Sequence, residues 1–237
     1  MTPELVGSDR APGLMVAPGT TIPADAKIAP WVTIHAGVVL GAGVVLGQGA
    51  IIGRPQQIDS RSRTPISPAG DPTVLGDRCC VGSYSIVTAG AQVGPGSRIG
   101  DHVLVRERAV VEEEAVVGQG SVVGRRSRIG ARARLQAQVV VGPGTVLEED
   151  VFVSARVTFV GDPTMGRGPA GTAPGRVVAR RGSRIAVGAI IVPPAELGEE
   201  SVVGAGSLVR SQVPPRTVVA GTPARHLRPV RDDELLR

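Results

Sequence analysis

Three histidines are the side chains of this sequence best suited to move a proton near neutral pH: His35, His102 and His226. They are spread over the whole chain, and no two are spaced closely enough to hold one metal ion together. Cys79 and Cys80 are adjacent and add no metal-ligand spacing. We therefore expect no metal site, and each histidine is a candidate base or a plain surface residue.

An apolar residue recurs at every sixth position, and this repeat predicts the elements that must position those side chains. The series runs from Ile22 to Ile52, from Leu75 to Phe159 and from Ala179 to Val209, often with Gly next and a small fifth residue. A period of six fits a short strand followed by a corner, so three units close one triangular coil of 18 residues. Coils then stack about 4.8 Å apart. The predicted fold is an all-β parallel β-helix, a solenoid whose core is Val, Ile, Leu and Ala.

The division of the chain follows from the repeat. We expect a lead-in over residues 1–21, the β-helix over 22–214, and a C-terminal turn with a short helical segment over 215–237. Two insertions, 54–74 and 160–178, interrupt the repeat. If the first, second and third faces begin with Ile22, Ile28 and Ile34, and Leu75 resumes on the first face, both insertions leave from the corner between the third and first faces, here named the loop edge. They lie about five coils, or roughly 24 Å, apart, and long loops sharing one edge indicate a site there.

Charged residues stack below the second insertion on the loop edge. Glu107 and Arg125 share one column and Asp162 lies in the next, so we expect a polar wall that faces a substrate, and fewer charges on the other two edges. Glu107 and Asp162 are three coils apart, roughly 14 Å. His102 falls on a different corner, between the second and third faces, so we expect it to matter less than the two carboxylates.

The repeat resembles that of the hexapeptide-repeat acyltransferases over about residues 22–228. The resemblance implies a left-handed β-helix, a homotrimer with sites between neighbours, and acetyl-CoA as co-substrate. The segment from Ser207 to Arg225 is similar to the closing signature of acetyl-CoA-dependent members, although Arg210-Ser-Gln stands where they often have Thr-Lys-Asp. By this resemblance the coenzyme contacts are Ala186, Gly204, Ala205, Arg210, Gly221, Thr222, Pro223 and Arg225.

Three segments look like a narrower group, the N-acetyltransferases of amino-deoxysugar nucleotides: 99–107, 134–136 and 157–167. One departure is Gly161-Asp162-Pro163, where members often have Asn-Asp-Asn. Some members of that group have no evident base, and the amine loses its proton to a carboxylate or to the departing sulfur. By this resemblance Glu107, Asp162 and His102 are the catalytic candidates, and the substrate contacts are Gln136, Thr164, Arg167 and Arg125.

The resulting hypothesis is transfer of an acetyl group from acetyl-CoA to the amine of a nucleotide-linked amino sugar. The alternatives are another acyl transfer, such as sugar O-acetylation or amino-acid succinylation, and a non-catalytic scaffold. A γ-type carbonic anhydrase needs three histidines on zinc, and the spacing of the histidines argues against it.

Composition excludes several other classes of protein. The 237 residues include only four aromatic side chains, too few for the stacking platforms of a single-strand nucleic-acid binder. The net charge of +5 comes from scattered Arg, with Lys27 the only Lys, so no nucleic-acid partner is expected. No apolar run reaches about 18 residues, and the segment 1–9 has no apolar signal region. We expect a cytoplasmic protein without a membrane contact.

Overall fold

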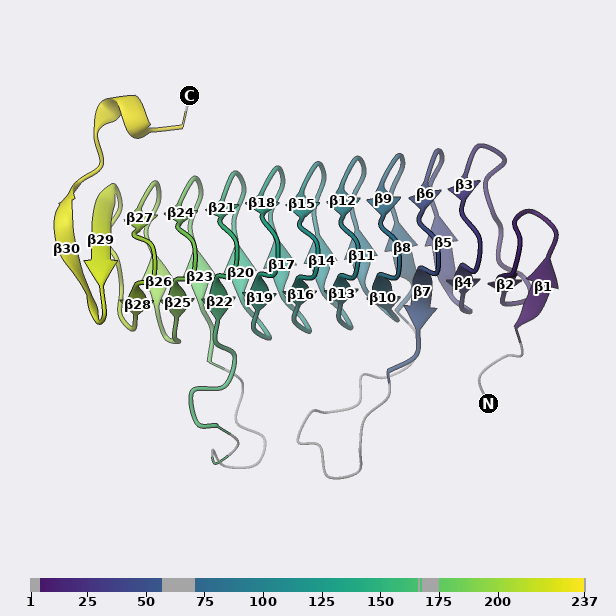
Figure 1. Ribbon diagram of the computed structural model, residues 1–237, viewed down its shortest axis with the longest axis horizontal. Helices are drawn as coiled ribbons and strands as arrows, with labels where there is room; N and C mark the ends of the chain where they lie inside the picture. The colour runs from purple at the N-terminus through teal and green to yellow at the C-terminus, as the bar shows by residue number, and fades with distance from the viewer. Residues whose placement is uncertain (1–4, 57–70, 166, 168–174, 237) are drawn as a thin grey trace.

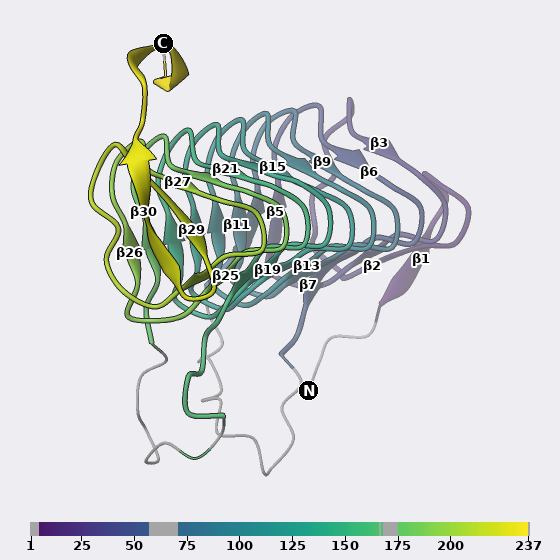
Figure 2. The same cartoon turned by 60° about the vertical axis from the view of Figure 1, so that its left-hand side comes forward.

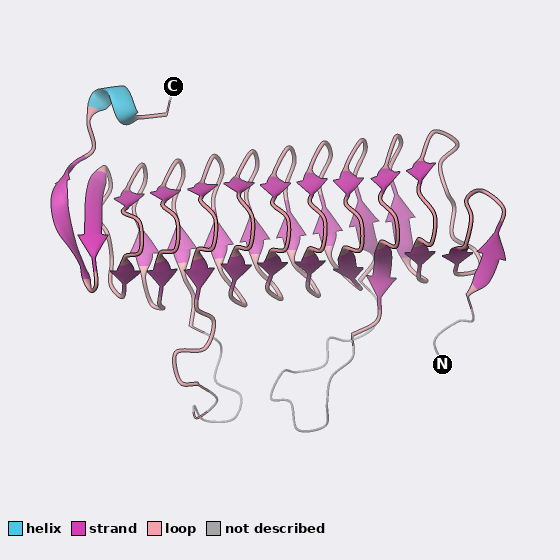
Figure 3. Ribbon diagram, viewed as in Figure 1, coloured by secondary structure: helices cyan, strands magenta, loops and turns pink. Residues whose placement is uncertain are grey.

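The computed structural model describes residues 5–56, 71–165, 167 and 175–236. Very short parallel strands wind into a long three-sided solenoid, with the N-terminal end at one tip and the C-terminal end at the other (Figure 1). Almost all regular structure is strand (Figure 3), and the turned view of Figure 2 shows the coils stacked one behind another. This is the parallel β-solenoid that the six-residue repeat predicts, and it is consistent with the left-handed form.

The first face is an eight-stranded sheet, all of it parallel. Leu40 of one coil pairs with Leu75 of the next, so the first insertion is bridged without any shift of register. From the N-terminal end its strands are β5 (Val38–Leu40), β8 (Thr73–Leu75), β11 (Gln92–Val93), β14 (Val110–Val111), β17 (Arg128–Ile129), β20 (Val146–Leu147), β23 (Val178–Ala179) and β26 (Glu196–Leu197).

The second face is an eleven-stranded sheet that ends in an antiparallel hairpin at the C-terminal tip. Its strands are β3 (Lys27–Ile28), β6 (Val45–Leu46), β9 (Cys80–Val81), β12 (Arg98–Ile99), β15 (Val116–Val117), β18 (Arg134–Leu135), β21 (Phe152–Val153), β24 (Arg184–Ile185), β27 (Val202–Val203), β29 (Thr217–Gly221) and β30 (Ala224–Pro229).

The third face is also an eleven-stranded sheet, and it begins with an antiparallel hairpin at the N-terminal tip. Its strands are β1 (Val6–Ser8), β2 (Leu14–Val16), β4 (Thr33–Ile34), β7 (Ile51–Arg54), β10 (Ile86–Thr88), β13 (Leu104–Val105), β16 (Val122–Val123), β19 (Val140–Val141), β22 (Thr158–Phe159), β25 (Ile190–Ile191) and β28 (Leu208–Val209).

The core is the stack of inward-pointing residues that the repeat identifies. Ile52, Val87 and Ile129 are fully buried, and Phe159 is the aromatic side chain enclosed with them. Small residues at the fifth position, such as Ala109 and the hydroxyl-bearing Ser127, are buried at the tight corners. Because each strand contributes only one or two inward side chains, stability comes from the length of the stack and not from any single element.

Both insertions leave the solenoid at the loop edge, as the repeat predicts. The chain departs after β7 and returns at β8, and it departs again after β22 and returns at β23, on the same side of the molecule (Figure 1). In each case it leaves the third face and rejoins the first, and β7 and β22 are five coils apart in the sheet. The insertion residues 57–70, 166 and 168–174 lie outside the described residues.

The two ends of the chain differ from the expected division. The solenoid begins before residue 22, because β2 pairs in parallel with β4 and both Leu14 and Val16 are buried. At the other end, the expected helical segment is a single 3-10 turn, η1 (Asp232–Glu234), and most of the tail is the β29–β30 hairpin. No helix of the described residues is long and apolar enough to cross a bilayer.

Candidate active site

Seven of the eight expected coenzyme contacts gather on one corner, between the second and third faces near the C-terminal tip, here named the coenzyme edge. The β29–β30 hairpin turns at this corner: the Gly221 amide donates to Ser207 Oγ at 3.1 Å, and Thr222 Oγ1 donates to the Gly206 carbonyl at 3.2 Å. Gly204 and Ala205 follow β27 directly beside it. Arg225 is exposed, and among the described residues its side chain reaches only the neighbouring Ala224 carbonyl, at 3.0 Å. Arg210 instead follows β28 and lies on the loop edge.

The coils next to this hairpin leave room along the coenzyme edge. Ala186 begins the corner one coil away, and a Cβ added at Gly188 or at Gly206 would meet no atom within 4 Å. An extended ligand lying along the solenoid would therefore meet backbone and small side chains here.

His102 also lies on the coenzyme edge, six coils from the hairpin, which is roughly 29 Å along the axis. The imidazole is exposed and stacks on the ring of Tyr84, with ring centroids 5.5 Å apart and planes 13° from parallel. Tyr84 in turn covers Gly49, where a Cβ would come within 2.7 Å of the ring, so this position requires glycine. The stacked pair holds His102 in one orientation on the surface.

Gln136 lies on the same edge two coils further on, and its amide oxygen accepts two hydrogen bonds within the protein. Gln136 Oε1 accepts hydrogen bonds from Ser154 Oγ at 2.9 Å and from the Ala155 amide at 3.1 Å. These bonds tie one corner to the next, so the geometry gives Gln136 a part in shaping the edge.

Glu107, the central residue of the loop edge, is buried to 2% exposure. Arg106 binds it through two hydrogen bonds, from Nε to Oε2 at 3.1 Å and from Nη2 to Oε1 at 3.0 Å. Gln56 Nε2 donates to Oε1 at 3.0 Å, and Arg125 Nε lies 3.8 Å from the same oxygen. A carboxylate so enclosed is suited to positioning arginines rather than to taking a proton from a substrate.

Arg125 shares that corner, and its side chain is only 12% exposed. Its Nε is buried and has no hydrogen-bond partner among the described residues. Burial lowers the pKa of Arg125, the Arg126 cation lowers it further, and Glu107 only partly opposes them.

Both ends of the first insertion are fastened to this corner. Gln56, at its start, reaches Glu107, while Asp71, at its end, pairs with Arg108 at 2.8 Å. The second insertion starts three coils away at Asp162, whose Oδ1 accepts from the Thr164 amide at 2.8 Å and from Thr164 Oγ1 at 2.6 Å. Thr164 in turn accepts from the Arg167 amide at 3.1 Å. Asp162 and Thr164 therefore shape the base of that insertion.

Sequence reasoning did not find the pair formed by His35 and Arg54 on the loop edge. Burial lowers the pKa of His35, and the Arg54 cation lowers it further. His35 Nδ1 and Arg54 Nε are both buried without a hydrogen-bond partner among the described residues. The repeat contained a signal for this position. His35 comes directly after an inward residue of the third face, as Arg106 does three coils later, so both fall on the loop edge.

The predicted site residues therefore fall on two separate edges. His102, Gln136 and the hairpin lie on the coenzyme edge, while Glu107, Arg125 and Asp162 lie on the loop edge. The third face separates the two edges by on the order of 15 Å, the span of about five extended residues. One chain therefore does not bring the two sets together.

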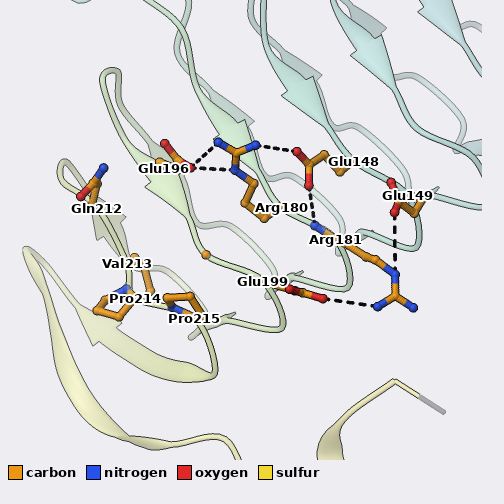
Figure 4. A pocket seen from close by; sticks show the side chains of 11 residues that line it. Glu148, Glu149, Arg180, Arg181, Glu196, Glu199, Gln212, Val213, Pro214 and Pro215 are labelled. Atoms are coloured by element: carbon orange, nitrogen blue, oxygen red, sulfur yellow. Dashed lines mark hydrogen bonds and ion pairs between the residues drawn. The ribbon is translucent and has the colours of Figure 1, made fainter.

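The corner between the first and second faces carries more charge than we expected. Arg180 donates to Glu148 at 2.8 Å and to Glu196 at 2.7 Å, and Arg181 pairs with Glu149 and Glu199 at 3.7 and 3.3 Å (Figure 4). These residues line a groove of about 720 Å³ together with Val213, Pro214 and Pro215. The expectation of fewer charges on the other edges was wrong for this one. Its charges are paired with one another, so they stabilise stacked coils.

No group of three or more His, Cys, Asp or Glu within the described ranges is arranged to hold a metal ion.

Comparison with known proteins agrees with the repeat. The family model "Bacterial transferase hexapeptide (six repeats)" matches residues 16–54, and "GMPPB C-terminal domain" matches residues 68–160. Serine acetyltransferase of Escherichia coli is 39% identical over 87 residues, which is 37% of this chain and only 30% of that enzyme.

Two solved structures share the fold over most of the chain. UDP-N-acetylglucosamine acyltransferase of Campylobacter jejuni has a TM-score of 0.53 at 17% identity, covering 86% of this chain and 75% of that one. The enzyme of that name from Francisella novicida gives 0.54 at 12% identity, over 90% and 68%. The family models and the relatives support a place for this chain among the hexapeptide-repeat acyltransferases.

Proposed function

We propose that this protein transfers an acetyl group from acetyl-CoA to the amine of a nucleotide-linked amino sugar. The observation that carries the proposal is the distribution of the site over two edges at matching height. A chain that climbs about 4.8 Å per 18 residues places His102 about 1 Å from the height of Glu107 and about 6 Å from that of Arg125. In a three-fold assembly with its axis along the solenoid, equal heights meet, and the coenzyme edge of one subunit faces the loop edge of the next.

Acetyl transfer to an amine makes few demands on side chains. The amine must be neutral, and its lone pair must reach the thioester carbonyl. A C–N bond forms, the C–S bond breaks, and one proton leaves the nitrogen and is returned to the sulfur. His102 is the group we assign to carry that proton, because its imidazole is exposed and lies on the coenzyme edge. Glu107 and Asp162 become positioning residues, since their oxygens already accept hydrogen bonds.

The assignment of the donor rests on the hairpin. Arg225 is exposed beside the turn that resembles the coenzyme signature, and a guanidinium suits a phosphate. The five coils between the hairpin and His102 give an adenosine diphosphate and its extended pantetheine arm room to run along the axis.

The test is complementation between impaired subunits, assayed at acceptor concentrations well below the wild-type KM. One variant carries His102→Ala and the other Arg125→Gln, and the two are co-expressed with different tags so that mixed trimers can be purified. Each mixed trimer should recover part of the wild-type turnover, because one interface pairs an intact His102 with an intact Arg125. Mixed trimers as inactive as their parents, or a monomer by sedimentation, would contradict a site shared between subunits.

Transfer to a hydroxyl is the second candidate, favoured by the identity to serine acetyltransferase. A panel of amino-sugar nucleotides, neutral sugars and serine with acetyl-CoA decides between them. Free thiol should be released with the amino-sugar nucleotides and not with serine or the neutral sugars, and release with serine or a neutral sugar alone would replace our proposal.

A further inference from the structure

Among the described residues, two adjacent coils of the loop edge hold four arginines and fewer carboxylates to pair with them. Arg106, Arg108, Arg125 and Arg126 occupy two successive coils of this corner, and the Arg126 amide donates to the Glu107 carbonyl between them. The carboxylates paired with this group among the described residues are those of Glu107 and Asp71.

Glu107 is shared unequally between two arginines. Arg106 takes both of its oxygens, and Arg108 binds Asp71 at 2.8 Å. Arg125 has only a long ion pair with Glu107, at 3.8 Å, its Nε has no hydrogen-bond partner among the described residues, and Arg126 is exposed beside it. Burial lowers the pKa of Arg125, the Arg126 cation lowers it further and Glu107 only partly opposes them, so a further anion would stabilise the charged form of Arg125.

The space next to these two arginines is open. In the following coil the corner is Pro143-Gly144, and a Cβ added at Gly144 would meet no atom within 4 Å. One coil beyond, the second insertion begins at Gly161-Asp162. A small group could therefore rest on the Pro143-Gly144 corner between the arginines and the base of the second insertion.

We propose that Arg125 and Arg126 bind the diphosphate of the nucleotide-linked acceptor on this shelf. Guanidinium forks match phosphate oxygens two at a time, and a partly buried fork binds them without strong competition from water. Glu107 then acts as a positioning residue: its Oε1 binds Arg106 at 3.0 Å and lies 3.8 Å from Arg125, so it offsets the repulsion between these two cations. The inference rests on the proposed function, because it takes the diphosphate from the acceptor proposed there.

The experiment uses isothermal calorimetry with inorganic pyrophosphate on the assembled wild-type protein, Arg125→Gln, Arg126→Gln and Arg98→Gln. Arg98 is an exposed arginine of β12 on the second face and serves as the matched control for loss of one charge. We expect pyrophosphate affinity to fall by at least tenfold in each loop-edge variant and to stay unchanged in Arg98→Gln. The KM for the accepted sugar nucleotide should rise by a similar factor in Arg125→Gln, with partial rescue in Arg125→Lys.

The outcomes separate this proposal from the function it rests on. If no amino-sugar nucleotide is acetylated but the loop-edge variants still lose pyrophosphate, the proposed function fails and the anion site stands. If both variants bind pyrophosphate like wild type, the anion site is overturned. Dissociation of those variants on sedimentation would then identify a carboxylate of a second copy as the counter-anion. Should Arg125→Gln fail to fold, the exposed Arg126→Gln carries the test.

Discussion

The coenzyme edge and the loop edge are made from the same 18-residue coil, yet their corners differ in kind. Near the C-terminal tip the coenzyme edge consists of small residues such as Ala186, Gly188 and Ala205, and the hairpin turns beside them. The loop edge carries a buried carboxylate, four arginines in two coils, and the starts of both insertions. One edge offers backbone and space, while the other offers charge.

This contrast shows how the repeat divides its tasks. The inward residues of all three faces are interchangeable Val, Ile and Leu, so the faces determine only where each corner lies. The outward residues of the corners are free to vary without disturbing the core, and there the two edges have diverged. Because one set would suit a thioester donor and the other an anionic acceptor, the contrast supports a site shared by two subunits.

The sharpest way to break the comparison is His102→Ala. We expect kcat to fall by about 10²- to 10⁴-fold, the usual contribution of a general base, with little change in the KM for acetyl-CoA. Gln138→Ala is the control, because Gln138 lies in the same column two coils away and bonds only Arg156 through its side-chain oxygen. Near-normal turnover of His102→Ala in a thiol-release assay would contradict this role and would indicate that a residue of the loop edge carries the proton.

Arg225→Ala tests the donor end of the coenzyme edge. The loss of a charge-assisted phosphate contact, about 1.5–3 kcal/mol, should weaken acetyl-CoA binding by roughly tenfold or more by calorimetry. The unfolding midpoint should hardly move, because the side chain reaches only a neighbouring carbonyl. Arg216→Ala, exposed at the opposite end of β29, should bind normally; equal losses in both variants would point to a general effect of charge.

Glu107→Gln distinguishes a catalytic role of Glu107 from a structural role in positioning the arginines. Removing the negative charge deprives Arg106 and Arg125 of their shared counter-ion. The free energy of unfolding should therefore drop by about 1–3 kcal/mol in urea titrations. Glu113→Gln, an exposed carboxylate one corner further along, should change it by less than about 0.5 kcal/mol. Full stability together with a large loss of kcat in Glu107→Gln would mean that Glu107 takes part in the chemistry.

The smallest expected effect concerns His35 on the loop edge. Its pKa is lowered by burial and then by Arg54, so the unfolded chain binds more protons than the folded one just below the ordinary histidine pKa of about 6.5. Stability should therefore fall as pH drops through that region, and the fall should be smaller in His35→Gln. Unfolding curves at about pH 7.5 and about pH 5.5 measure it, and equal slopes for the two proteins would contradict the assignment.

The period of six is enough to predict the three faces, while the loop edge also needs the assumption that Leu75 resumes on the first face. Leu75 resumes on the face of Leu40, and that register alone puts both insertions on one corner. The early start of the solenoid was also readable, since Val16 stands six residues before Ile22. The β29–β30 hairpin was not readable, because Pro223 and the charged residues after it break the repeat.

The roles of the site residues depended on contacts that no spacing reveals. Glu107 is neutralised by its own neighbour Arg106, although adjacent residues of a strand would point to opposite sides. At a corner both can turn toward the same partner. The ladder of Glu148, Arg180 and Glu196 was hidden for another reason: the second insertion separates the first two residues in sequence although their coils are adjacent.

His102 and the hairpin lie on a single edge, six coils apart, so the distance between them is fixed by the number of stacked coils. Deleting one whole coil of 18 residues between them would shorten the interval by about 4.8 Å and leave both on the same edge. Deleting six residues would instead rotate everything beyond the cut by one face and move the hairpin to another edge. The distance between the hairpin turn and His102 along this edge can therefore change only by whole coils of about 4.8 Å. The number of coils would then determine how long an extended ligand must be to reach from one to the other.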